Sequence, residues 1–141
     1  MIGFTHLVFA LALVHLSGFP VIYGAVAGIF PDIDILFNRE FPISHRGILH
    51  TPLAAVFLSA LLYLATGRRS HAYSFFTGYV SHLFLDTFTY SGIHWLYPVK
   101  GALSFEAVGY ASIGANLGIS ALSLFLASGW SHRSEVRGWM S

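Results

Sequence analysis

The chain has 141 residues, of which 55% are hydrophobic and only 9% are charged. Ordinary soluble domains carry about 25% charged residues, so this composition excludes a typical water-soluble protein and predicts residence in a membrane. The formal net charge of +1 argues against a nucleic-acid partner, and the absence of cysteine excludes disulfides and thiolate metal sites.

Five apolar stretches follow one another along the chain, at residues 2–16, 19–37, 48–66, 72–90 and 107–130. A membrane-spanning helix needs about 20 residues, within a range of about 17–25. The first stretch is short, and the others are long enough. We therefore expect an all-α, multi-pass bundle of about five transmembrane helices in the cell membrane, or four if the first stretch lies in the interface. This single domain would cover residues 1–130, followed by a polar tail over residues 131–141.

Four of these segments carry residues that could bind a metal ion, all near one common end of the expected bundle. Ionisable groups in hydrocarbon cost several kcal/mol unless they are paired or bound, so such a cluster indicates a functional site. Histidine and carboxylate ligands together suit zinc or a similar divalent cation. The residues are His6 in the first stretch, Asp32 and Asp34 in the second, His45 and His50 before and in the third, and His82 and Asp86 in the fourth.

The second stretch contains a proline between its apolar part and its two carboxylates. Pro31 disfavours the helical conformation of the residue before it, so the second helix is expected to kink or end there. An irregular turn would let Asp32 and Asp34 converge as metal ligands or as a general base. The alternative is a helix cap or a carboxylate facing water, and this alternative is stronger for Asp34.

The segment before the third apolar stretch is dense in polar side chains. Thr51 and Pro52 are typical of a helix N-terminus, whose dipole favours an anion such as phosphate beside His50. Arg46 is a permanent, bidentate partner for a phosphate or carboxylate. We expect His45 and His50 to bind metal, and Arg46 and Thr51 to bind the substrate anion, with Arg46 neutralising charge during the reaction. The alternative is an interfacial loop with an arginine reaching to water.

His82 and Asp86 form the sharpest local pattern, because an i, i+4 spacing puts both side chains on one helical face. They could bind one ion, or form a His–Asp hydrogen-bonded pair between helices. His6 is expected to be a ligand, although an interfacial histidine costs little. His94 could close the site from a loop. Asn116 is the main polar residue of the fifth stretch, which we interpret as structural.

These motifs, at residues 6, 31–34, 45–51 and 82–87, resemble the YdjM-like family of membrane-bound, metal-dependent hydrolases over roughly residues 1–98. A more distant likeness is to zinc-dependent phospholipase C and the related single-strand nucleases, which use a His-x-x-x-Asp pair on a helix within an all-helical multi-zinc site. The resemblance implies an integral membrane hydrolase that uses a divalent metal.

Carried over by position, His82 and Asp86 would match that pair, His50 an upstream ligand and His94 a downstream one. His6 and Asp32 would match an early ligand and an aspartate near the attacking water. The later ligands of the soluble enzymes have no counterpart after His94, so we expect one or two ions, with zinc as the preferred metal, rather than three.

Three functional hypotheses follow. The first is hydrolysis of a lipid-linked phosphoester by a metal-activated water, with a membrane lipid or lipid-linked molecule as substrate. The second is a metal-ion carrier or sensor without catalysis, which the clustering of ligands at one end disfavours. The third is a metal-dependent amide or ester hydrolase. Only Arg46 and the anion site at the helix end favour the first hypothesis over the third. Glycine- and alanine-bearing helices would also permit a homodimer.

Overall fold

A computed structural model describes residues 3–37, 47–89, 93–99 and 112–138, with side chains placed as far as residue 129. Within these ranges the chain is helical and contains no strand, which confirms the all-α prediction. The elements are α1 (Gly3–Leu16), α2 (Val21–Ile29), the 3-10 helix η1 (Phe30–Ile33), α3 (Asp34–Phe37), the 3-10 helix η2 (Ile48–His50), α4 (Pro52–Thr66), α5 (Arg69–Thr87) and α6 (Ile113–Gly138).

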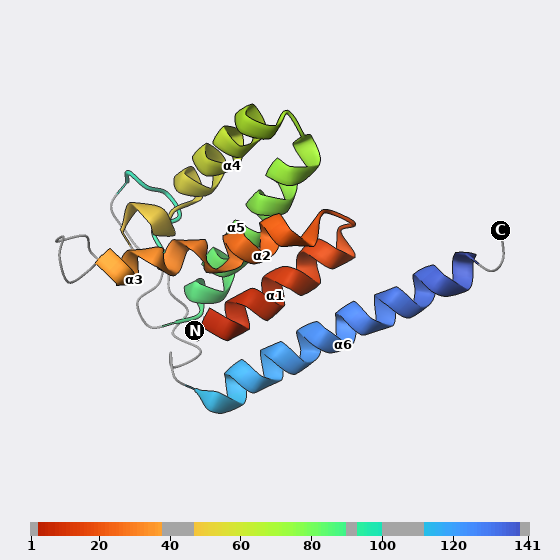
Figure 1. The fold of residues 1–141 in the computed structure, drawn as a ribbon. Helices are drawn as coiled ribbons and strands as arrows, with labels where there is room; N and C mark the ends of the chain where they lie inside the picture. Colours follow the sequence, from red (N-terminus) through yellow and green to blue (C-terminus); the bar gives the residue numbers. More distant parts are fainter. Residues whose placement is uncertain (1–2, 38–46, 90–92, 100–111, 139–141) are drawn as a thin grey trace.

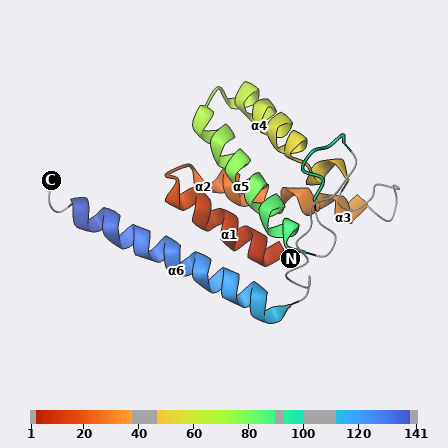
Figure 2. The same ribbon diagram turned by 180° about the vertical axis from the view of Figure 1, so that it is seen from behind.

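Helix α5 is the centre of the arrangement and packs against α1, α2 and α4. Helices α1 and α2 lie beside each other, α5 returns along α4, and α6 runs along the outer side of α1 (Figure 1). The view from behind shows α6 along one side of the bundle and α4 at the opposite side (Figure 2). Helix α6 continues to Gly138, past residue 130, where the sequence predicted the start of a polar tail.

The helix ends that the sequence predicted are present. Helix α2 ends at Ile29 and η1 follows with Pro31 in its first turn, so the carboxylates of Asp32 and Asp34 leave the regular helical spiral. Thr51 caps α4 by accepting a hydrogen bond from the Ala54 N–H at 3.2 Å, with Pro52 as the first helical residue. These two breaks bring the acidic turn and the η2 turn to the C-terminal half of α5.

Gly78 lets α5 approach α2 until their backbones are almost in contact. A Cβ placed on Gly78 would overlap the carbonyl oxygen of Gly24 and lie 2.7 Å from its Cα. Only glycine at this position permits the observed distance between the two helices. One helical turn further on, the same face of α5 carries His82 and the same face of α2 carries Gly28, so this contact sets the distance between those two residues.

The interior is polar and the surface is apolar. Tyr79, Leu83 and Ile93 form part of the core with several alanines, but the most buried side chains also include three histidines and two aspartates. Many large hydrophobic side chains face outward instead, for example Leu64 at 76% and Phe125 at 73% exposure. Exposed apolar surface on this scale marks a contact with lipid or another protein.

Among the described residues, no helix combines the length and the hydrophobicity needed to cross a membrane. The prediction of about five transmembrane helices, or four, is therefore not confirmed. The second apolar stretch is divided after Ile29, which leaves α2 with 9 residues. Helices α1 and α4 have 14 and 15 residues. At about 1.5 Å per residue they are roughly 21 and 22 Å long, shorter than the hydrocarbon core of about 30 Å.

Candidate metal centre

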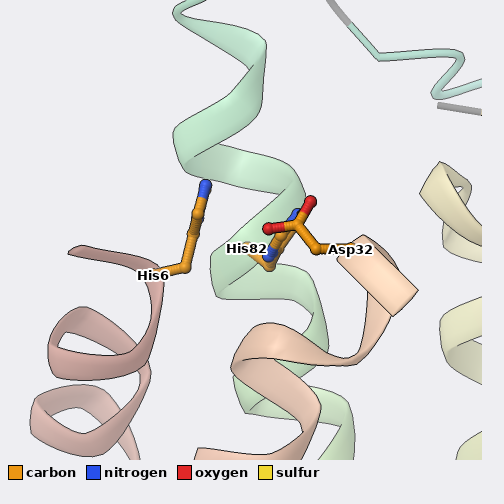
Figure 3. Close-up of side chains that lie close together, drawn as sticks. All are labelled: His6, Asp32 and His82. Carbon is orange, nitrogen blue, oxygen red and sulfur yellow. The ribbon is translucent and has the colours of Figure 1, made fainter. Parts of the chain in front are cut away.

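Six acidic and imidazole side chains meet where α1, η1, α3, η2 and the C-terminal half of α5 come together. Figure 3 shows three of them, with the Asp32 carboxylate of η1 beside the His82 ring of α5 and His6 approaching from α1. All but Asp32 are buried, and the Asp32 side chain keeps 22% of its surface exposed. We call this set the His/Asp cluster, and it consists of His6, Asp32, Asp34, His50, His82 and Asp86.

Four atoms of the cluster face one another. The Nε2 atom of His50 lies 3.5 Å from Asp32 Oδ1 and 4.0 Å from Asp86 Oδ2. The Nε2 atom of His82 lies 3.6 Å from Asp32 Oδ1 and 3.7 Å from Asp86 Oδ2. Two nitrogens and two oxygens from three different elements therefore converge on one small volume.

These distances are longer than direct hydrogen bonds and lie nearer to the spacing of ligands around a shared cation. Donor and acceptor of an N–H···O bond lie about 2.7–3.2 Å apart, and all four distances are longer. Ligands bound to zinc at about 2.0–2.2 Å in a tetrahedral arrangement lie roughly 3.3–3.5 Å from one another. Two triplets bring their ligand atoms within 4.8 Å of one another, namely His6 with Asp32 and His82, and His50 with His82 and Asp86.

The hydrogen bonding of His82 fixes which of its nitrogens can bind metal. Its Nδ1 lies 2.9 Å from the carbonyl oxygen of Gly28. A carbonyl can only accept, so Nδ1 carries the hydrogen and donates it. The buried Nε2, which makes no hydrogen bond within the described structure, is left to face the carboxylates of Asp32 and Asp86. Because both triplets share His82, its single available nitrogen can serve only one ion at a time.

Asp34 and His6 contact the sides of His50 and Asp86 that face away from the four converging atoms. Asp34 Oδ2 lies 3.3 Å from Nδ1 of His50, on the opposite side of the ring from Nε2. His6 Nε2 lies 3.2 Å from Asp86 Oδ1, the oxygen that does not face His50 and His82. His6 also stacks on His82, with ring centroids 3.9 Å apart. Such partners orient metal ligands and fix their tautomers, so Asp34 and His6 are placed to position His50 and Asp86.

A second layer of hydrogen bonds holds η2 and the end of α5. The buried Tyr79 donates its hydroxyl hydrogen to the carbonyl of Leu49 at 2.5 Å, directly before His50. Thr89 donates to the carbonyl of Asp86 at 2.7 Å. Sequence reasoning missed both Tyr79 and the Gly28 carbonyl. A lone tyrosine in an apolar helix is usually a packing residue, and a backbone carbonyl leaves no signature in the sequence.

The remaining predicted site residues fall in different places. The Thr51 hydroxyl donates to Ile48 O at 2.7 Å while it caps α4, and the residue is buried, so its observed role is structural. Its contact with a substrate stays a prediction. His94 is half-buried and belongs to neither triplet of potential ligands in the described structure. His45 and Arg46 lie outside the described residues, and their predicted roles stay predictions.

Fold and site together define an all-helical protein with an apolar surface and a buried cluster of histidines and aspartates that could hold a metal ion. The sequence profile of the YdjM inner membrane protein family matches residues 1–140, and the chain belongs to this family. No curated protein and no solved structure matches the chain.

Proposed function

We propose that this protein is a membrane hydrolase that uses one divalent ion, zinc in the first instance, to cleave a lipid-linked phosphoester. The observation that supports it best is the state of His82. Its Nδ1–H is used by the Gly28 carbonyl, and its Nε2 faces two carboxylates that are themselves acceptors. The lone pair of Nε2 and those of the carboxylate oxygens repel one another, and burying them together costs free energy unless a cation lies among them.

The donor set fits a zinc-type ion. His50, His82 and Asp86 would hold it and leave a fourth position for water, with the Asp32 carboxylate close to the same imidazole nitrogens. A ligand set of two imidazole nitrogens and carboxylate oxygens is typical of zinc and related divalent metals. When bound, the ion would acidify a water molecule and polarise the phosphoryl oxygen. Of the expected one or two ions we favour one, because His82 offers a single nitrogen.

Other side chains would act as the general base, position the metal ligands and bind the phosphate. Asp32 is the carboxylate of the cluster that reaches the surface, so substrate and water would approach from its side and it is the candidate general base. Asp34 and His6 would hold His50 and Asp86 in place. Arg46, four residues before His50, is proposed to bind the phosphate and neutralise the charge that develops on it.

A substrate with an apolar tail is supported by the surroundings of the cluster. Each element that supplies a ligand also exposes a large apolar side chain one or two positions away. These are Phe4 beside His6, Ile33 beside Asp32, Ile48 beside His50, and Phe84 between His82 and Asp86. Residues two positions apart on a helix point to different sides, so these side chains do not line the cluster, but they give the elements that carry it an apolar outer surface. Such a surface suits a molecule whose head enters the cluster and whose tail stays in lipid. The family membership places the chain among membrane proteins.

The test combines metal analysis with hydrolysis. The purified protein in mild detergent is expected to contain one equivalent of zinc, and to release the head group of a phospholipid or polyprenyl phosphate. Asp86→Ala and His82→Ala are expected to lose both properties. His71→Gln, at the other end of α5, is the matched control and should keep both.

Different results would reject different parts of the proposal. Metal and activity that persist in Asp86→Ala would reject the site. Zinc that is bound without hydrolysis of any ester, together with ion uptake into sealed vesicles, would favour the carrier hypothesis. Cleavage of carboxyl esters or amides but not of phosphoesters would reassign the substrate class.

A further inference from the structure

A cavity lies between α4 and α5, away from the His/Asp cluster. Its volume is about 420 Å³, within the range of about 300–1,000 Å³ that small-molecule sites have. Helix α5 rises roughly 20 Å from Arg69, which lines the cavity, to His82 in the cluster. The cavity is therefore separate from the candidate metal centre.

The same spacing on both helices builds the walls. Positions i, i+3, i+4 and i+7 of one helical face lie in a row. Helix α4 contributes residues 56, 59, 60 and 63, and α5 contributes residues 69, 72, 73 and 76. Most of these residues are exposed, so the rows lie at the outer edge of the contact between α4 and α5, and the cavity is an open groove. The cavity is about two turns long, or roughly 10 Å.

The chemistry of the lining is apolar with one cation. Val56, Phe76 and the rings of Tyr63 and Tyr73 supply apolar surface. The Ser59 hydroxyl is directed to the Ala55 carbonyl at 2.7 Å, so it offers little to a ligand. Arg69 is exposed beside the first turn of α5 and carries the permanent charge of the cavity. Arginine binds phosphate with two parallel hydrogen bonds.

We propose that this cavity binds an anionic phospholipid, with the phosphate head group at Arg69 and the start of an acyl chain between α4 and α5. The apolar walls alone would accept any lipid tail. The charge of Arg69 selects the anionic head, because a zwitterionic head group carries a cation that offsets its phosphate. This site is independent of the hydrolase proposal and needs no metal.

The test is a titration of the full chain in detergent with phosphatidylglycerol or phosphatidylcholine of identical acyl chains, with bound lipid counted by native mass spectrometry. We expect one tightly retained phosphatidylglycerol, bound about tenfold more strongly than phosphatidylcholine, the size expected for a charge-assisted hydrogen bond. Arg69→Gln should lower phosphatidylglycerol binding to the level of phosphatidylcholine. The matched control is Arg68→Gln, which removes the neighbouring charge outside the cavity and should keep the preference.

A second variant tests the cavity itself. Ala60→Leu adds apolar volume to the wall without changing charge, and it should reduce retention of both lipids while circular dichroism stays that of the wild type. The proposal is overturned if Arg68→Gln and Arg69→Gln weaken binding equally, which would indicate a diffuse charge effect. It is also overturned if the two lipids bind alike, or if a folded Ala60→Leu protein binds both as the wild type does.

Discussion

Replacing Gly78 with alanine tests whether the contact between α2 and α5 supports the candidate metal centre. The added Cβ would meet the backbone of Gly24, including its Cα at 2.7 Å. Backbone atoms cannot rotate away, so the helices must separate. Overpacking of this kind costs about 1–3 kcal/mol, while the higher helix propensity of alanine returns up to about 1 kcal/mol. We expect a net loss of about 1–2 kcal/mol in the free energy of unfolding.

The same displacement should weaken metal binding, because the Gly28 carbonyl and His82 Nδ1 lie one turn beyond the contact and 2.9 Å apart. Loss of a partner that orients a metal ligand typically lowers affinity by about 10- to 100-fold. Thermal unfolding in detergent and a zinc competition titration would measure the two effects.

Gly118→Ala in α6 is the control for this substitution. Its Cβ would meet nothing within 4 Å, so it should stabilise the helix slightly and leave zinc affinity unchanged. The reasoning is refuted if Gly78→Ala behaves like Gly118→Ala in both measurements.

Other consequences follow from the same contacts. Asp34→Asn should lower zinc affinity by about 10- to 100-fold, because Asp34 faces Nδ1 of His50 and orients that ring. Elemental analysis should still find one equivalent of zinc at saturation. Less than one equivalent at saturation would show that Asp34 binds the ion directly. Tyr79→Phe should cost about 1 kcal/mol in thermal unfolding, because the Leu49 carbonyl loses its donor, whereas the exposed Tyr73→Phe should change stability by less than about 0.5 kcal/mol. A chelator should lower the unfolding temperature of the wild type but not that of His82→Ala.

Local patterns in the sequence were sufficient to predict several parts of the site. Pro31 has no N–H with which to continue the hydrogen bonding of α2, which gives way to η1, although Phe30 keeps helical backbone angles instead of the extended ones expected before a proline. Thr51 and Pro52 start α4 by local hydrogen bonding and a fixed φ angle. His82 and Asp86 share a face because of helical periodicity alone. Each of these features depends on neighbours in the chain, so the sequence carries the information directly.

Features set by the packing of distant segments were not predicted. The approach of α5 to α2 depends on Gly78, which meets the backbone of Gly24, 54 positions away in the sequence, and Gly78 does not look special by itself. The division of roles among the carboxylates also depends on packing. Asp34 and Asp32 are two residues apart, yet one faces the Nδ1 atom of His50 and the other its Nε2 atom. The break after Ile29, which divides the second apolar stretch, is one reason why the number of spanning helices stays a prediction, because hydropathy counts apolar residues without showing where a helix ends.

The polar interior suggests why folding and metal binding should be coupled in this protein. A core that contains histidines and aspartates gains less from the hydrophobic effect than an aliphatic one, and buried charges cost several kcal/mol each unless they are matched. The imidazole–carboxylate contacts match them in part, at 3.2 Å for His6 and Asp86 but at 3.5–4.0 Å for the four converging atoms. A divalent ion among those atoms would supply the missing attraction, so its binding energy would be folding energy. The buried cluster would then serve the stability of the helical bundle as well as its chemistry.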